Sequence, residues 1–384
     1  MFLKVIKTDI IEGLHKSANI IPTKTGAAFL RTIWLKVEDG LLHIMSTDSN
    51  LEFCGAYKAD IQDSGLAGVQ GRSFYELMKK LPEGEIALSL DQENKALVIE
   101  QGARKYKLPT NDQTWFQNFS EFPNSDSVFW SGDILQELID RISFCISDED
   151  TMEAIACMSL KPQTEQRIEV CGLNGHQFAM FSFLHDDLHA LLPEEGILVQ
   201  KKYIGELKKW LSSDEIELNI SNKRLFFRTG DHSETFSLPL SYYQYPEYHN
   251  FLAKLGEDGA STLTVDRGEL LDALERLLIF NTENNRCTYF SFGQDECVLT
   301  TQGQEVGSAT ETLATSFSGD LDKIAFPTRN LIEILGHYQS DKLEFTLTGS
   351  EGPCGIRGAD DPDYNVIIMP MKIVEETYYS EESS

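Results

Sequence analysis

The sequence has 384 residues, of which 41% are apolar and 24% charged, as is typical of a soluble globular protein with two or three domains. Its formal net charge of −28 contributes solubility through self-repulsion. Taken alone, that charge argues against nucleic acid as a partner, because phosphates are bound by local cations. Seven scattered cysteines without a Cys-x-x-Cys pair exclude a zinc ribbon and a disulfide framework, and they fit a reducing compartment.

The sequence carries no signal for export or membrane insertion. Residues 1–7 are too short and too charged for a signal peptide, and no apolar run approaches the roughly 18 residues that span a bilayer. We therefore expect a cytoplasmic protein without a membrane partner.

Each third of the chain begins with an amphipathic segment that predicts a helix, because apolar residues follow a capping residue at helical spacing. The three segments are residues 8–16, 131–139 and 266–274. We expect Thr8, Ser131 and Asp266 to act as their N-caps.

A second helix-forming segment recurs with similar sequence at residues 69–77, 199–207 and 326–334. Its glutamates, Glu76, Glu206 and Glu333, are 130 and 127 residues apart. A period of this length corresponds to a whole domain rather than to a solenoid unit. The chain is therefore predicted to contain three copies of one domain.

Alternating apolar and polar residues after each second helix predict half-buried antiparallel strands at 85–90, 215–220 and 342–347. The last strand of each domain is expected to end near a proline, at Leu108-Pro109, Leu238-Pro239 and Met369-Pro370. The predicted class is α+β, with two helices and strands for two antiparallel sheets in every domain.

Proline-containing linkers at residues 122–124 and 245–247 separate the three copies. The predicted domains are 1–126, 127–254 and 255–373, followed by an acidic tail, 374–384, that we expect to be disordered.

The few cations are concentrated on the second helix of each copy. They are Arg72, Lys79 and Lys80 in the first copy, Lys201, Lys202, Lys208 and Lys209 in the second, and Arg329 and His337 in the third. Such residues also occur on ordinary solvated helix faces, paired as Arg72–Glu76 or Lys202–Glu206 would be. If the repeats close into a ring, however, equivalent faces line one channel and can hold phosphates without reading a base sequence.

No catalytic motif is present: the sequence has no phosphate loop, no HExxH and no GxSxG. The acidic segment 148–153 is expected to be an exposed loop, although a metal-dependent hydrolase site there is a third possible function. The pair His185 and His189 lacks further zinc ligands, and Asp360, Asp361 and Asp363 indicate a hairpin turn. We expect no enzyme activity, no metal and no cofactor.

Four short motifs give the chain a family resemblance: Met369-Pro370-Met371, residues 173–179, Thr47-Asp48 after Gly40, and residues 81–84. With the threefold repeat, they make residues 1–373 resemble the bacterial β sliding clamps, the processivity subunits of DNA polymerase III. The resemblance implies three clamp domains forming half of a closed ring, made by a head-to-tail homodimer around duplex DNA.

The resemblance also implies partners and sites. The implied partners are the polymerase III catalytic subunit, the clamp loader, and other polymerases and repair proteins. DNA contacts would come from Lys24, Arg72, Lys79, Lys80, Lys201 and Lys202. The dimer interface would include Tyr106, Leu108, Ile279 and Phe280. A pocket for partner peptides would include Ile155, Leu173, Gly175, His176, Phe178, Pro246, Phe251, Ile367, Ile368, Met369, Pro370 and Met371.

The sequence departs from the family pattern at Asn250, Asn285, Pro327 and Asn330, so the pocket wall is expected to be more polar or reshaped. From Ile367 to Met371 the segment also fits a simple last core strand. These departures and the strong negative charge leave a second function open, a divergent paralogue that acts as a protein-interaction ring with weak DNA loading. The acidic tail, starting beside the pocket, would be placed to compete with partners.

Overall fold

The computed structural model describes residues 1–22, 27–148, 152–221, 223–256, 259–283, 285–303 and 306–373. Contacts divide the chain into two compact units. The first combines Met1–Ile139 with Asp186–Tyr242, and the second combines Asp140–His185 with the chain from Tyr243 onward. The middle repeat is thus shared between the units, which the sequence pattern did not indicate.

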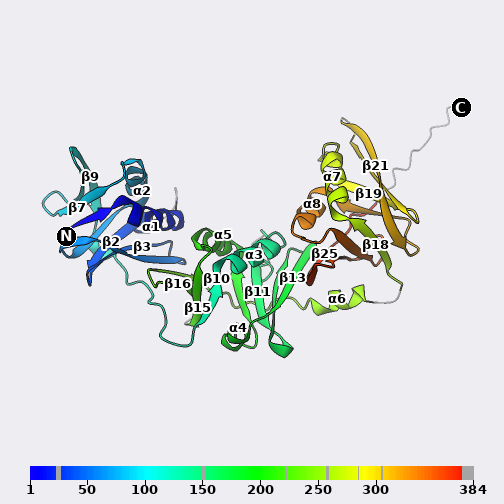
Figure 1. Cartoon of the computed structure of the whole chain (residues 1–384), viewed down its shortest axis with the longest axis horizontal. Helices are drawn as coiled ribbons and strands as arrows, with labels where there is room; N and C mark the ends of the chain where they lie inside the picture. The colour runs from blue at the N-terminus through cyan, green and yellow to red at the C-terminus, as the bar shows by residue number, and fades with distance from the viewer. Residues whose placement is uncertain are drawn as a thin grey trace. The chain divides into compact units, whose positions relative to one another are not determined.

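Each repeat contains the two predicted helices, which confirms the α+β class (Figure 1). The first helices are α1 (Lys7–Ile20), α3 (Gly132–Ser143) and α7 (Arg267–Leu278); the second are α2 (Gly71–Lys80), α5 (Lys201–Trp210) and α8 (Thr328–Gly336). A strand precedes every one of them, so strand and helix alternate in the same order three times.

One antiparallel sheet runs through the first unit and joins two repeats. In spatial order its strands are β10 (Val128–Ser131), β15 (Glu215–Ser221), β16 (Arg224–Thr229), β17 (Glu234–Pro239), β4 (Glu52–Lys58), β3 (Leu41–Thr47), β2 (Thr32–Glu38), β6 (Gly65–Gln70), β9 (Arg104–Asn111), β8 (Ala96–Gln101), β7 (Glu85–Asp91), β1 (Phe2–Ile6) and β5 (Asp60–Asp63). The pairing of β17 with β4 connects the middle repeat to the first.

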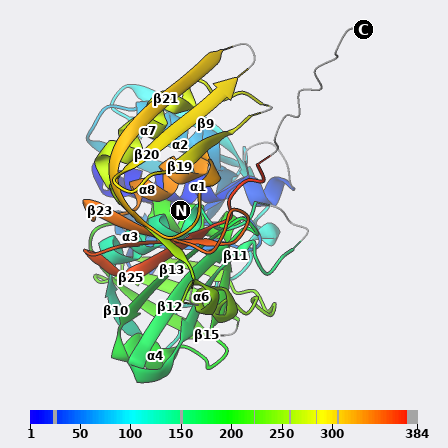
Figure 2. The same cartoon turned by 90° about the vertical axis from the view of Figure 1, so that its right-hand side faces the viewer.

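The second unit is built in the same way. Its strands follow the order β11 (Cys157–Pro162), β12 (Arg167–Leu173), β13 (Gln177–Leu184), β25 (Asp361–Ile368), β24 (Cys354–Gly358), β23 (Lys342–Leu347), β18 (Ser261–Asp266), β21 (Gly307–Ser318), β20 (Glu296–Gly303), β19 (Cys287–Phe292) and β22 (Lys323–Pro327). Here β13 pairs with β25, which connects the middle repeat to the third. Strands β19, β20 and β21 lie side by side in Figure 2.

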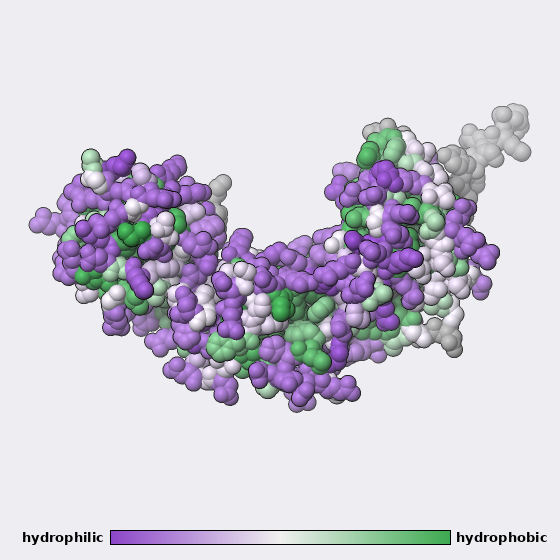
Figure 3. Space-filling model, viewed as in Figure 1, coloured by the Kyte–Doolittle hydropathy of each residue, from purple (hydrophilic) through white to green (hydrophobic). Residues whose placement is uncertain are grey.

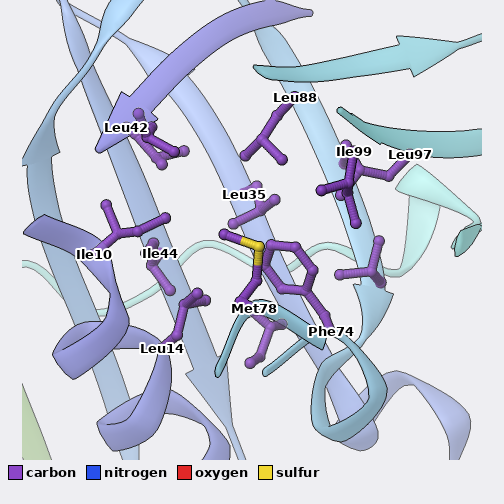
Figure 4. Close-up of a cluster of buried hydrophobic side chains, with 14 of the residues drawn as sticks. Ile10, Leu14, Leu35, Leu42, Ile44, Phe74, Met78, Leu88, Leu97 and Ile99 are labelled. Carbon is purple, nitrogen blue, oxygen red and sulfur yellow. The ribbon is translucent and has the colours of Figure 1, made fainter. Parts of the chain in front are cut away.

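The core of the first repeat shows how helices cover a sheet (Figure 4). Ile10 and Leu14 of α1 and Phe74 of α2 point toward strand side chains and are each at most 1% exposed. The strand residues that meet them are Leu35, Leu42, Ile44, Leu88, Leu97 and Ile99. Burial of such side chains contributes about 1.5–3 kcal/mol each to folding.

Some local predictions were confirmed and one was wrong. Asp266 caps α7 by accepting a hydrogen bond from the Glu269 N–H at 2.9 Å, as predicted. Thr8 does not cap α1, because the helix already begins at Lys7 and its N-cap is Ile6, which offers no side-chain acceptor. The amide of Lys7 is instead satisfied by the carbonyl of Gly84 at 3.0 Å.

Two short helices were not predicted, α4 (Asp186–Leu191) and α6 (His249–Leu255). The chain also includes β14 (Ile197–Gln200), the strand that precedes α5.

Candidate nucleic-acid interface and partner site

Helix α2 separates apolar from cationic residues as the sequence predicted. Phe74 and Met78 are fully buried, whereas Arg72, Lys79 and Lys80 are exposed. The side chain of Gln70 starts the helix by accepting a hydrogen bond from the Ser73 N–H at 2.6 Å. Three cations on one short exposed face can contact phosphates without any base-specific group.

Lys7 adds a fourth cation next to α2, which sequence reasoning missed. Its Nζ donates to the carbonyl oxygens of Lys79 at 2.9 Å and Leu81 at 2.5 Å, at the C-terminal end of the helix. A cation is favourable at this end because the last carbonyls of a helix carry partial negative charge. The signal in the sequence was a lysine directly before the segment 8–16 that was predicted to be a helix.

Helix α5 repeats the arrangement in the middle repeat. Tyr203, Ile204 and Leu207 are buried, and Lys202 is exposed with its Nζ 4.8 Å from the centre of the Tyr203 ring. Glu206 pairs with Lys209 at 2.8 Å. In the described residues neither Lys202–Glu206 nor Arg72–Glu76 forms an ion pair. The two ion pairs expected for an ordinary solvated helix face are therefore not formed.

The third helix of this kind, α8, carries fewer charges. Leu331, Ile334 and Leu335 are fully buried and Arg329 is exposed. His337 follows the helix and stacks on Phe144, with ring centres 4.5 Å apart. The exposed cationic character is therefore strongest in the first two repeats. Lys24 lies outside the described residues.

The residues predicted to form a partner pocket all belong to the second unit, which contains a compact apolar cluster. Phe178 and Ile367, which are opposite each other in the β13–β25 ladder, form its centre together with Tyr248. The ring of Phe178 stacks on Tyr248 with centres 5.1 Å apart. Further members are Cys171, Met180, Leu173, Tyr245, Leu252 and Leu255.

Several members of this cluster were not predicted: Tyr248, Leu252 and Leu255 come from α6 and the residue before it. Apolar residues at positions 248, 252 and 255 have the spacing of one helix face. That spacing was the available signal, although Pro246 just upstream made the segment look like a linker.

The predicted pocket residues differ in accessibility. Phe251 is 46% exposed and Met371 is 43% exposed, so both can meet an incoming peptide. Leu173, Pro246, Met369 and Pro370 are half-buried, and Gly175 and His176 are exposed. Ile155, Phe178, Ile367 and Ile368 are buried.

Backbone contacts hold the last described segment against this cluster. The amide of Met369 donates to the His176 carbonyl at 2.8 Å, and the amide of Met371 donates to the Ala325 carbonyl at 2.7 Å. The turn at Gly175 has φ +86°, which favours glycine, and Asn174 Oδ1 accepts from the amides of His176 and Gln177. Exposed methionine next to a rigid turn suits a site that adapts to different peptides.

Charged groups border one side of the cluster. Tyr248 donates its hydroxyl hydrogen to Glu169, and His249 lies 3.4 Å from the same carboxylate. On its other side His249 meets Glu247 at 2.7 Å. That hydrogen bond lowers the pKa of Glu247, so Glu247 is ionised at neutral pH.

The residues that depart from the family pattern are accessible. Asn250 is exposed, and Asn285 and Asn330 are half-buried; the amide of Asn285 donates to the Gln302 carbonyl at 2.7 Å. Pro327 is the last residue of β22, an edge strand, where the absence of an amide hydrogen costs no ladder bond.

The predicted dimer residues lie at the two ends of the repeat series. Tyr106 and Leu108 are half-buried on β9 and pack against the core of the first repeat. Ile279, which follows α7, is 72% exposed, and Phe280 is half-buried. A large exposed isoleucine next to a partly exposed phenylalanine is the kind of surface that protein contacts cover.

A buried ion pair that sequence reasoning missed joins the first and middle repeats. Lys16 of α1 contacts Glu234 of β17 at 2.7 Å, and Tyr57 donates to the same carboxylate at 2.8 Å. The Lys16 and Glu234 side chains are only 12% and 7% exposed. We call this group the first joint.

A second joint, also missed, connects the middle and third repeats. Arg141 of α3 contacts Asp361 of β25 at 3.0 Å, with the side chains 10% and 1% exposed. Asp361 also accepts hydrogen bonds from the Ser340 amide and hydroxyl and from the Gln339 amide. Lys16 and Arg141 are each the tenth residue of the first helix in their repeat, which was the signal in the sequence.

Other groups singled out in the sequence can be examined only where the structure describes them. Within the described ranges, no three His, Cys, Asp or Glu side chains are grouped so that they could hold a metal ion. Asp148 and Glu153 are exposed, while Glu149 and Asp150 lie outside the described residues.

Burial raises the pKa of the Cys54 thiol to about 11, so it is protonated at neutral pH. Among the helices described, none is long and apolar enough to cross a membrane.

Comparison with known families matches all three repeats. The model described as "DNA polymerase III beta subunit, N-terminal domain" matches residues 1–120, the central-domain model matches 131–241, and the C-terminal-domain model matches 255–372. These ranges fall within the predicted domains, whose boundaries stay a prediction.

Individual proteins match over the same length. The beta sliding clamp of Caulobacter vibrioides is 23% identical over 379 residues, and that of Pseudomonas aeruginosa is 24% identical over 377; each match covers 97% of this chain and all of the relative. Among solved structures, a putative DNA polymerase III beta subunit from Eubacterium rectale has a TM-score of 0.89 at 19% identity. A sliding clamp from Bartonella birtlesii bound to griselimycin has 0.88 at 23%, and both matches cover 97% of this chain and all of the other. At these identities the structural matches show the fold.

Proposed function

The chain belongs to the DNA polymerase III beta subunit family, the DNA sliding clamps, and from that premise we propose that two copies close head to tail into a ring around duplex DNA. The ring holds DNA by topology, and loose phosphate contacts let it slide. It has no catalytic step of its own. Its effect on replication comes from keeping a bound polymerase at a high effective concentration near the primer end.

The observation that carries this proposal is the recurrence of an exposed cationic helix in each repeat. Arg72, Lys202 and Arg329 each follow the start of a second helix and are exposed. Most side chains on the face of the molecule seen in Figure 3 are hydrophilic, with apolar groups in separate patches. Cations gathered on equivalent helices explain how a chain of net charge −28 can hold DNA without sequence preference.

The apolar cluster of the second unit supports a partner site on the same ring. Phe251 and Met371 expose apolar surface, and the amide of Met369 is hydrogen-bonded to His176 in the turn at Gly175. We propose that the polymerase III catalytic subunit, the clamp loader, and other polymerases and repair proteins insert an apolar peptide there. The carboxylates of Glu169 and Glu247 at its border favour peptides with a basic flanking residue.

Retention on DNA of different topology tests the central part of the proposal. After loading onto a nicked circular plasmid, the protein is expected to remain bound through gel filtration and to be lost quickly once the plasmid is linearised. Matched loading onto linear DNA with both ends blocked should restore retention. Equal loss from circular and linear DNA would contradict encirclement and would favour the alternative of a protein-interaction ring with weak loading.

A further inference from the structure

Methionine and cysteine are the side chains that mild oxidants attack, and this chain presents few of them to solvent. All eight methionines lie in the described part of the chain. Met152 is 60% exposed and Met371 is 43% exposed. Met1 and Met369 are half-buried, and the other four are at most 8% exposed. An oxidant in solution therefore reaches the thioethers of Met152 and Met371 first.

The cysteines do not compete with these methionines for an oxidant. All seven are free; six are buried and the seventh, Cys54, is half-buried. The form of cysteine that reacts is the thiolate. Burial raises the pKa of the Cys54 thiol, and it raises the pKa of the Cys297 thiol to about 12, so both are protonated at neutral pH. Burial also raises the pKa of Cys171 in the apolar cluster. A peroxide at low concentration should therefore modify methionine before cysteine.

Met371 belongs to the predicted partner site, whereas Met152 does not. Among the described residues of that site, the large apolar side chains that are exposed are those of Phe251 and Met371. A phenylalanine ring is not changed by mild peroxide, but a thioether becomes polar when it is oxidised. Met371 is thus the point at which an oxidant can change the polarity of the exposed apolar surface.

The backbone around Met371 is held on both sides of Pro370. The amide of Met369 donates to the His176 carbonyl at 2.8 Å, and the amide of Met371 donates to the Ala325 carbonyl at 2.7 Å. Pro370 itself has a fixed φ. Because both hydrogen bonds would have to break before the main chain could move away, an oxidised Met371 side chain stays at the partner site.

The oxidation itself needs one molecule of hydrogen peroxide for each thioether. The sulfur lone pair attacks one peroxide oxygen, so that a sulfur–oxygen bond forms while the oxygen–oxygen bond breaks. The other oxygen leaves as water, taking the proton of the transferred oxygen. Sulfur is oxidised by two electrons and the peroxide is reduced by two. The product, methionine sulfoxide, is polar and chiral where the thioether was apolar.

We propose that Met371 is a reversible oxidation site, at which hydrogen peroxide forms a sulfoxide that weakens the binding of partner peptides. This rests on the proposed insertion of an apolar peptide at the partner site. A peptide that covers Met371 would take the sulfoxide oxygen out of water without giving it a hydrogen-bond donor, which is unfavourable. Methionine sulfoxide reductases reverse the step with thiols, which become a disulfide while the oxygen leaves as water.

Peptide mapping by mass spectrometry tests the modification without any partner. The protein is treated with millimolar hydrogen peroxide at neutral pH, and catalase stops the reaction at successive times. Met371 and Met152 should each gain one oxygen several times faster than Met78 and Met158, which are 0% and 2% exposed. Oxidation of Met371 at the rate of the buried methionines would overturn the inference.

Binding of the purified polymerase III catalytic subunit tests the consequence. Only the immobilised clamp is oxidised, and surface plasmon resonance gives the dissociation constant before and after treatment. We expect the constant to rise about fivefold or more, and sulfoxide reductase should return it to its starting value. Circular dichroism should show unchanged thermal unfolding, because Met371 is exposed. An unchanged dissociation constant with Met371 fully oxidised would overturn the inference.

Two variants assign the effect to one methionine, each compared with itself before and after peroxide. Met371→Leu keeps an apolar side chain without sulfur, and its affinity should no longer respond to peroxide. Met152→Leu is the matched control and should respond as the wild type does. A response that persists in Met371→Leu, or that is lost in Met152→Leu, would overturn the assignment. A wild-type clamp that fails to bind the catalytic subunit before any oxidation would instead overturn the proposed partner site.

Discussion

The two joints within the chain connect neighbouring repeats with different chemistry. In the first, Lys16 and Tyr57 share the Glu234 carboxylate, and the ammonium lies 5.8 Å from the Trp210 ring centre. In the second, the carboxylate of Asp361 receives one guanidinium group and three further hydrogen bonds. In both joints a cation from the first helix of one repeat lies next to an acid from the last strand of the following repeat.

The chemistry of each joint determines how strongly its stability depends on its ions. A buried charge is costly unless its hydrogen-bonding groups are satisfied. The guanidinium of Arg141 also lies over the rings of Phe181 and Tyr364, 5.5 and 5.3 Å from their centres, and the Tyr364 hydroxyl donates to the Arg141 backbone carbonyl at 2.8 Å. The ions of the second joint therefore have more contacts than those of the first. We expect its removal to lower the free energy of unfolding by more than removal of the first joint.

Removal of Arg141 is the largest expected effect. Arg141→Ala leaves Asp361 buried without its cation, and we expect the free energy of unfolding to fall by about 3–5 kcal/mol. Urea denaturation followed by circular dichroism measures the change. The control is Arg167→Ala, whose partner Asp363 is 48% exposed, and it should cost no more than about 1 kcal/mol. Equal losses for the two variants would show that burial of the second joint is energetically unimportant.

The first joint should be the weaker of the two. Glu234→Ala leaves both the Lys16 ammonium and the Tyr57 hydroxyl without an acceptor, and we expect a loss of about 2–3 kcal/mol in the same denaturation assay. Glu38→Ala removes an exposed partner of Lys36 and serves as the control, with an expected loss below about 1 kcal/mol. A loss larger than that of Arg141→Ala would reverse the ranking of the joints.

The packing of the first joint can be disturbed without touching a charge. A Cβ at Gly55 would lie 2.3 Å from the Tyr57 hydroxyl oxygen, so Gly55→Ala should displace that ring and cost about 1–3 kcal/mol. Adding Tyr57→Leu, which removes the hydroxyl that meets the new Cβ, should recover part of the loss. If the double variant is less stable than the single one, the steric account of Gly55 is wrong.

The smallest expected effect is a dependence on pH at the second joint. Burial alone would raise the pKa of Asp361, but hydrogen bonds from Ser340, Gln339 and Arg141 outweigh it and lower the pKa below its usual value. The resulting stability is complete above the unfolded pKa of about 3.9 and is lost as the pH falls through the lowered folded pKa.

The measurement compares the wild type with Asp361→Asn. The difference in their unfolding free energy should be constant above about pH 5 and should shrink below about pH 4. Exposed Asp360→Asn should show no such trend. A difference that stays constant down to pH 2 would contradict the assignment to Asp361.

The helices and strands of each repeat could be predicted because their signals are local. The spacing of Phe74 and Met78, or the alternation in β23, is visible within ten residues. The two joints could not be found in this way, since Lys16 and Glu234 are 218 residues apart in the chain. Their geometry depends on which strand edges pair, and β4–β17 pairing leaves no mark in either strand alone.

The candidate site could also be predicted only in part from the sequence. The cations of α2 and α5 were found because the motif recurs, whereas Tyr248 and Leu252 of the apolar cluster were missed because α6 has only 7 residues and no side-chain cap. The acidic tail from residue 374 lies outside the described residues, so its proposed competition with partners stays a prediction. Truncation after Ile373 with unchanged partner affinity would contradict it.

Solution mass combined with small-angle X-ray scattering tests the central claim most directly. Two copies closed head to tail predict a mass of twice the 43.3 kDa chain and a pair-distance distribution characteristic of a hollow ring. A monomeric mass at micromolar concentration, or a dimer whose scattering fits an open chain of repeats, would contradict closure into a clamp.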